Sequence, residues 1–100
     1  MVERMEVILK KRFQSKVDKL LFYLEQEFGK KGIDTFRRSL LSGLEIIKKY
    51  PESGAPTILE NVRSFRAGKH IRVYYKVKGN QLIILNMYDL RQDPSKNIFK

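Results

Sequence analysis

The sequence predicts an α+β domain in which an antiparallel helical hairpin packs on one face of a mainly antiparallel sheet. Two long segments with apolar residues three and four apart indicate the helices. Three short segments near the C-terminal end, joined by turns that contain glycine, indicate the strands. With one strand before the helices, the expected order is β-α-α-β-β-β, in a single domain spanning residues 1–100.

An N-terminal strand is expected from Glu3 to Lys10. Its alternate apolar residues share one face, because strand side chains repeat with a period of two: Met5, Val7 and Leu9. The alternation is imperfect, as in an edge strand or a strand in a mixed environment. The pattern does not say whether this strand pairs at an edge or in the centre of the sheet.

The first helix is expected from about Arg12 to Phe28 and the second from Ile33 or Asp34 to Lys49. Each has an apolar stripe facing the core. The first stripe contains Phe13, Val17, Leu20, Leu21, Leu24 and Phe28, and the second contains Phe36, Leu40, Leu44 and Ile47. Gly29 suits the end of the first helix, and Lys30-Lys31-Gly32 would form a short connection. So short a link predicts an antiparallel pair of helices.

The segment from Glu60 to Pro94 reads as a three-stranded antiparallel meander after the loop Pro51–Pro56. In the run His70–Val77, alternate residues would face the core: Ile71, Val73, Tyr75 and Val77. The other face would present His70, Arg72, Tyr74 and Lys76. Gly79-Asn80 is a hairpin signal, and the apolar run Leu82–Met87 is typical of a strand covered on both faces.

Composition narrows the function classes. The chain has 21 Lys+Arg against 11 Asp+Glu, a net charge of +10, which favours nucleic acid, an acidic protein or a membrane surface as partner. An inert solvated basic surface is the alternative. The absence of cysteine excludes thiolate metal sites and cysteine nucleophiles, and a lone histidine disfavours a histidine-based metal site. We therefore expect no metal and no cofactor.

No segment indicates a membrane protein. No apolar run approaches the roughly 20 residues that span a bilayer. The N-terminus lacks the apolar stretch of a signal peptide, so the expected location is the cytoplasm.

Cations and aromatic residues of the meander form the candidate site. Arginine forks suit phosphate oxygens, and tyrosine rings suit base stacking. For RNA cleavage, arginines could stabilise the charge of the phosphorane, and His70, Tyr88 or Tyr74 could transfer protons. The candidate catalytic residues are Arg72, Arg91, Tyr88 and His70, and the candidate RNA- or target-binding residues are Arg63, Arg66, Lys69, Tyr74 and Lys76. The alternative is an ordinary exposed strand face, which shows the same alternation of cations and apolar residues.

Several segments give the chain a resemblance to the RelE/ParE superfamily of bacterial type II toxins. They are Glu27-Phe28-Gly29, Tyr50-Pro51-Glu52-Ser53-Gly54, Val62-Arg63-Ser64-Phe65, His70-Ile71-Arg72-Val73-Tyr74-Tyr75 and Asp89-Leu90-Arg91-Gln92-Asp93-Pro94, in the element order given above. The resemblance covers nearly the whole chain. It implies a small basic toxin that is neutralised by an acidic antitoxin encoded beside it. The antitoxin would also supply the only contact with operator DNA.

Two activities follow from the resemblance as alternatives. RelE-like members enter the ribosomal A site and cut mRNA, whereas ParE-like members poison DNA gyrase and are not nucleases. Arg72 resembles the central-strand arginine of the RelE-like branch and Arg91 its second arginine. The arginine-rich strand face therefore favours ribosome-dependent mRNA cleavage slightly. A gyrase inhibitor without nuclease activity is the main alternative, and a degenerate member that only binds its antitoxin is the third.

Overall fold

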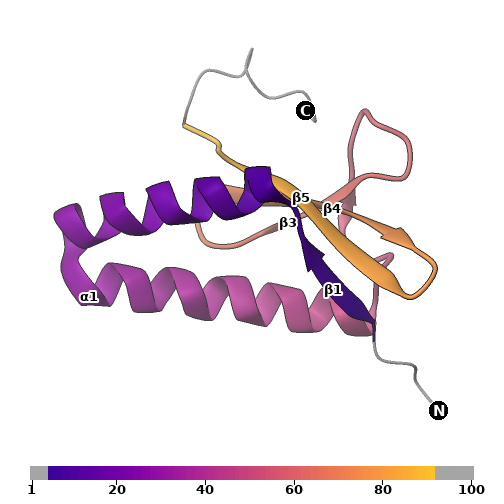
Figure 1. The fold of residues 1–100 in the computed structure, drawn as a ribbon, viewed down its shortest axis with the longest axis horizontal. Coiled ribbons are helices and arrows are strands. Elements are labelled where there is room, and N and C mark those ends of the chain that lie inside the picture. The colour runs from indigo at the N-terminus through magenta and orange to yellow at the C-terminus, as the bar shows by residue number, and fades with distance from the viewer. Residues whose placement is uncertain (1–4, 92–100) are drawn as a thin grey trace.

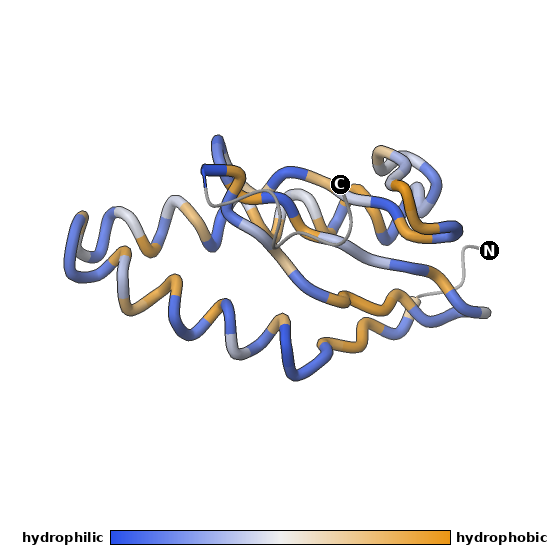
Figure 2. Tube along the Cα trace, turned by 90° about the horizontal axis from the view of Figure 1, so that it is seen from above, coloured by the Kyte–Doolittle hydropathy of each residue, from blue (hydrophilic) through white to orange (hydrophobic). Residues whose placement is uncertain are grey.

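A long helix, α1 (Lys11–Lys49), dominates the computed structural model, which describes residues 5–91 (Figure 1). Gly29 is its one residue with non-helical dihedral angles, φ 65° and ψ −157°, a conformation that glycine adopts most readily. The two arms of α1, residues 11–28 and 30–49, run in opposite directions from this point (Figures 1 and 2). The predicted connection Lys30-Lys31-Gly32 is wrong, because these residues are helical and the chain reverses at Gly29 itself.

The sheet has five strands and is mixed. They are β1 (Glu6–Leu9), β2 (Ala55–Pro56), β3 (Arg63–Arg66), β4 (Ile71–Lys78) and β5 (Gln81–Asp89), in the spatial order β1-β5-β4-β3-β2. Neighbours from β2 to β5 pair antiparallel, whereas β1 lies at an edge and pairs parallel with β5. The α+β class is therefore confirmed. The short strand β2, inside the predicted loop, and the parallel pairing are new features.

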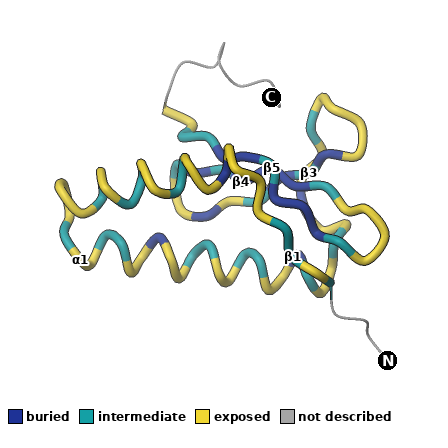
Figure 3. Tube along the Cα trace, in the orientation of Figure 1, coloured by how far each residue is buried: buried dark blue, intermediate teal, exposed yellow. Residues whose placement is uncertain are grey.

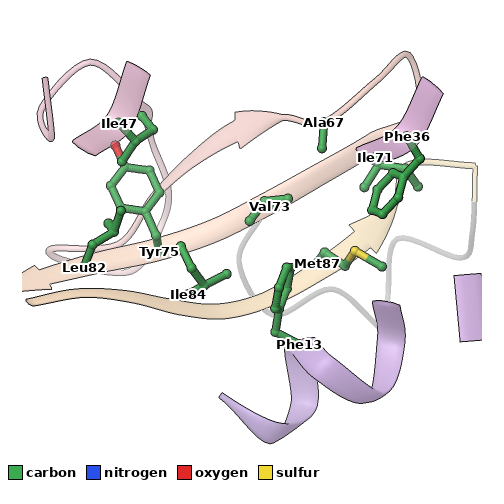
Figure 4. Packing of buried hydrophobic residues seen from close by; sticks show 10 residues of the cluster. All are labelled: Phe13, Phe36, Ile47, Ala67, Ile71, Val73, Tyr75, Leu82, Ile84 and Met87. Carbon is green, nitrogen blue, oxygen red and sulfur yellow. The ribbon is translucent and has the colours of Figure 1, made fainter. Parts of the chain in front are cut away.

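The core lies between α1 and one face of the sheet (Figure 4). Phe13, Phe36 and Ile47 are buried on α1, and they belong to the predicted stripes. Phe28 does not follow this pattern, because its side chain is 62% exposed where the arms extend beyond the sheet. The partly buried leucines that pack on the core are Leu20, Leu21, Leu24, Leu40 and Leu44.

The strand β4 follows the predicted alternation at its first three core positions. Ile71, Val73 and Tyr75 are buried in the core with α1, whereas Val77 is 39% exposed near the end of the strand. A register shift accompanies the step from Tyr74 to Tyr75, since these residues pair with Asn86 and Ile84 and leave Leu85 between them. Leu85 joins a second, smaller cluster around Val62 and Tyr74.

Some residues named in the predictions lie outside the described part of the chain. These are Glu3 and Arg4 of the expected first strand and the exit residues Gln92, Asp93 and Pro94. No helix within residues 5–91 is long and apolar enough to cross a membrane.

Candidate functional site

Three of the candidate residues form a row across the sheet. Arg66 of β3 pairs with Arg72 of β4, and Arg72 pairs with Tyr88 of β5. Arg72 is half-buried, and its Nη1 donates a hydrogen bond to the Ser64 hydroxyl at 2.8 Å. The guanidinium is thus held against β3, while Arg66 beside it is exposed. This row lies on the face away from the core residues Ile71 and Val73, because neighbouring residues of a strand face opposite ways.

Tyr74 lies beneath this face rather than on it. Its side chain is only 2% exposed and packs with Val62, Leu85 and Tyr88. The Tyr74 and Tyr88 rings meet edge to face, with centroids 6.0 Å apart and an interplanar angle of 75°. Tyr74 therefore supports the surface, and a nucleobase could not stack on it without displacing its neighbours.

Tyr88 is covered by a lysine that the sequence did not point to. Lys16 of α1 lies with its Nζ 3.3 Å from the centre of the Tyr88 ring and donates a hydrogen bond to the Met87 carbonyl at 3.0 Å. β1 stops pairing with β5 at Ile84, so the edge carbonyl at position 87 is accessible to α1. Burial, followed by the positive charges of Arg12 and Lys19, lowers the pKa of Lys16. In the sequence Lys16 resembles any cation on a solvated helix face.

Arg91 is bound by Asp89, which lies two residues before it in the sequence. Its Nε and Nη2 donate to the two carboxylate oxygens of Asp89 at 3.0 and 2.6 Å. The Arg91 backbone N–H also donates to Asp89, at 2.9 Å, which makes Asp89 a turn residue. These hydrogen bonds, led by the side-chain pair, hold the pKa of the Asp89 carboxyl below its ordinary value. Arg91 thus meets any ligand as part of an ion pair.

Two grooves converge on Arg91. One, of about 470 Å³, runs between the first arm of α1 and the end of β5, and its polar lining includes Lys16, Lys19, Tyr23 and Arg91. The other, of about 630 Å³, lies between both arms and the β3–β4 turn. It has an apolar floor and a basic rim formed by Lys31, Lys69, His70 and Arg91. The backbone carbonyl of His70 accepts a hydrogen bond from the Leu90 N–H at 2.7 Å, which fixes the turn beside the strand exit.

The remaining candidates, Arg63 and Lys76, lie toward the other end of the strands. Both line a third groove, of about 790 Å³, and Arg63 donates to the Gly54 carbonyl at 2.9 Å. Apart from the buried Tyr74, the candidates are thus divided between two regions. Arg66, Lys69, His70, Arg72, Tyr88 and Arg91 gather around the β3–β4 turn and the exit of β5. Arg72 and Arg91 have different internal partners, and Arg72 lines neither of the grooves that Arg91 borders.

Comparison with known structures identifies the fold. A chain of the chromosomal ParDE TA system from P. aeruginosa matches with a TM-score of 0.72, 15% identity, and coverage of 87% of this chain and 97% of that chain. A YoeB/ParE toxin from Agrobacterium tumefaciens matches at 0.64, with 13% identity and 85% and 98% coverage. The YoeB dimer from Staphylococcus aureus matches at 0.61, with 14% identity and 84% and 94% coverage. At these identities the likeness concerns the fold alone.

The sequence comparison is more specific. No curated protein matches the chain in sequence. A family model, described as the ParE toxin of the type II toxin-antitoxin system parDE, matches residues 7–93 and so includes all five strands except the first residue of β1. The chain therefore belongs to the ParE toxin family of type II toxin–antitoxin systems, within the RelE/ParE superfamily.

Proposed function

We propose that this toxin inhibits growth by binding DNA gyrase rather than by cutting mRNA, and that an acidic antitoxin neutralises it. The match to the ParE family model supports this choice, because the ParE-like branch is the one whose resemblance implies gyrase as the target. The net charge of +10 supports an acidic antitoxin, since opposite charge speeds and stabilises association. Gyrase and the ribosome both work in the bacterial cytoplasm, so either target places the protein there.

The internal partners of the two arginines carry the argument against RNA cleavage. Phosphorane stabilisation requires donors aimed at the developing charge before the reaction begins. Arg91 instead donates to both oxygens of Asp89, and Arg72 donates to Ser64. A phosphate at Arg91 would have to compete with a carboxylate that is already bound at 2.6 Å. Such a surface is better suited to recognition by shape and charge than to catalysis.

A second candidate function, ribosome-dependent mRNA cleavage, has one specific observation in its favour. His70 and Arg91 line the same groove, and the pKa of Asp89 is lowered by the hydrogen bonds from Arg91 and by the positive charges of Arg91 and His70. An imidazole, a carboxylate and a guanidinium in one place could move a proton and stabilise an anion. This arrangement becomes productive only if the substrate separates Arg91 from Asp89.

Two assays with the purified toxin separate the candidates. In the first, gyrase supercoils relaxed plasmid, and the toxin should inhibit supercoiling. In the second, programmed ribosomes carry a labelled mRNA, and no cut should occur in the A site. Addition of the acidic antitoxin should restore supercoiling. Cleavage on ribosomes with normal gyrase activity would establish the second candidate instead.

Variants locate the surface that acts on the target. Arg66→Ala and Arg91→Ala should each weaken gyrase inhibition about tenfold, since arginine is enriched among the few interface residues whose truncation costs more than about 1 kcal/mol. Arg38→Ala is the matched control, because Arg38 is an exposed arginine on the second arm of α1 and lies outside the site. Equal losses in all three variants would show that only overall charge matters. Unchanged inhibition by Arg66→Ala and Arg91→Ala would remove the site from the proposal.

A further inference from the structure

Three cations form a stripe along the first arm of α1. Arg12, Lys16 and Lys19 follow one another at steps of four and three residues, which places them on one face of the helix. Arg12 and Lys19 are exposed, and Lys16 between them is half-buried. Figure 3 shows that exposed positions continue along the whole length of this arm. We call these three residues the basic stripe.

No acidic side chain of α1 is placed to neutralise the basic stripe. Side chains on a helix meet at spacings of three and four residues, and no residue at those spacings from Arg12, Lys16 or Lys19 is acidic. On the second arm, by contrast, every lysine and arginine has Asp34 or Glu45 three or four positions away. No side chain within residues 5–91 forms an ion pair with the stripe. Its charge is therefore left for a partner.

The three charges are close enough to repel one another. Burial, followed by the positive charges of Arg12 and Lys19, lowers the pKa of Lys16. Lys16 is held in place, because its Nζ donates to the Met87 carbonyl at 3.0 Å and lies over the Tyr88 ring. The stripe is thus a concentration of positive charge around a fixed centre, and a bound anion would relieve the repulsion.

Duplex DNA is the anion that suits this arrangement best. From Arg12 to Lys19 the helix advances about 10 Å, at about 1.5 Å per residue. Duplex DNA carries one negative charge per about 1.7 Å of its axis, so several phosphates come within reach of the stripe. Two of the three cations are lysines, which are depleted in protein–protein interfaces but bind phosphates of the DNA backbone. An acidic peptide would need carboxylates at a matching spacing.

We propose that the basic stripe binds the phosphate backbone of duplex DNA. Contacts of this kind recognise charge and not bases, so the binding should be weak, salt-dependent and independent of sequence. The stripe borders the candidate functional site, because Lys16 and Lys19 line one of the two grooves that converge on Arg91. Resting on the proposed function, the DNA is that on which gyrase works. The toxin then contacts gyrase through the site and the DNA of gyrase through the stripe.

Fluorescence anisotropy of a labelled duplex measures the DNA contact with the toxin alone. The double variant Arg12→Ala/Lys19→Ala should raise the dissociation constant at least about tenfold at low salt. The slope of log affinity against log salt concentration should become shallower by about 2, since each lost phosphate contact removes about 0.9. The matched control is Lys30→Ala/Arg38→Ala, which removes the same charge from exposed positions of the second arm and should weaken binding less than about twofold. Circular dichroism should show both variants folded, because all four positions are exposed.

A supercoiling assay tests whether the stripe acts on gyrase. Arg12→Ala/Lys19→Ala should require at least about ten times more toxin for half-inhibition, whereas the control variant should match the wild type. Full inhibition by a variant that no longer binds DNA would overturn the role of the stripe on gyrase. A wild-type toxin that binds DNA through the stripe but leaves gyrase active would refute the proposed function and uphold the DNA contact.

Three results would overturn the DNA contact itself. A wild-type toxin that leaves the anisotropy of the duplex unchanged even at low salt does not bind DNA. Equal losses of affinity in the double variant and in the control would show that only overall charge matters. A double variant that loses affinity for the acidic antitoxin and keeps its affinity for DNA would assign the stripe to the antitoxin.

Discussion

Tyr75→Phe removes one buried oxygen atom and tests how the sheet is joined to the end of α1. The Tyr75 side chain is 1% exposed, and its hydroxyl donates to the Pro51 carbonyl at 2.7 Å. The same oxygen accepts from the Gly54 N–H at 3.1 Å. A Cβ on Gly54 would overlap this hydroxyl, so the turn after α1 is closely fitted around it. Phenylalanine keeps the ring and its packing on Phe65, and it deletes only these two hydrogen bonds.

The expected cost follows from those two bonds. Each contributes about 1 kcal/mol net, and the Gly54 N–H, left buried without an acceptor, makes the loss greater than that of an exposed pair. The free energy of unfolding should therefore fall by about 2 kcal/mol. For a domain of this size that corresponds to a melting temperature about 10 °C lower. Urea and thermal unfolding followed by circular dichroism measure both quantities.

The pH dependence gives an independent readout. Burial raises the pKa of Tyr75 above its ordinary value. The unfolded chain therefore releases this proton at a lower pH than the folded chain does, and stability falls as the pH rises from the unfolded value of about 10 toward the folded one. Tyr75→Phe should remove this part of the alkaline loss, so the two proteins should converge in stability above about pH 10.

The reasoning would be refuted by a Tyr75→Phe protein that unfolds within about 0.5 kcal/mol of the wild type. That result would mean that water satisfies Pro51 and Gly54 equally well. Gly54→Ala is the companion variant and should also destabilise, by about 1–3 kcal/mol, because the added methyl group meets the buried Tyr75 ring and the Ser64 carbonyl.

Three further predictions concern the helix and the ion pair. Leu40→Ala should cost about 2 kcal/mol, at the low end for leucine because the side chain is only partly buried on the core; melting close to that of the wild type would remove Leu40 from the core. Gly43→Ala should lower the melting temperature, because its Cβ would overlap the Phe65 ring on β3, and Ser42→Ala, on an exposed position of the same arm, is the control. Asp89→Asn should leave the melting temperature close to that of the wild type, because Arg91 is exposed and an exposed ion pair contributes little to stability. Since the pKa of Asp89 is lowered, the contribution of the pair is present above its unfolded pKa and is lost as the pH falls through the folded one, and an acid titration of Asp89→Asn should lack this loss.

The periodicity of apolar residues in the sequence was sufficient to predict the core-facing residues of α1 and β4. Phe13, Phe36 and Ile47 on α1, and Ile71, Val73 and Tyr75 on β4, are core residues at the positions that their periodicity predicted. The sequence also predicted that the first helix ends at Gly29. It did not predict that this one residue is the whole connection between the two arms of α1. Basic residues around the strand exit marked the candidate site as well, because their types and order resemble those of the superfamily.

Other features depend on partners that are distant in the sequence. β1 is an edge strand parallel to β5 because the chain leaves α1 into β2, at the opposite edge of the sheet, and comes back to β1 only with the last strand; alternation within Glu6–Leu9 could not reveal this. Tyr74 is buried rather than presented, because Val62 and Leu85 cover its face. Lys16 contacts Met87, 71 positions away in the sequence, and the adjacent Tyr88, and Asp89 binds Arg91 only once the turn is formed. Residue types and their spacing thus show where apolar, cationic and conformationally special positions lie along the chain. Which of the cations are already bound is a property of the folded molecule, because hydrogen bonds and burial depend on what the fold brings within about 3 Å.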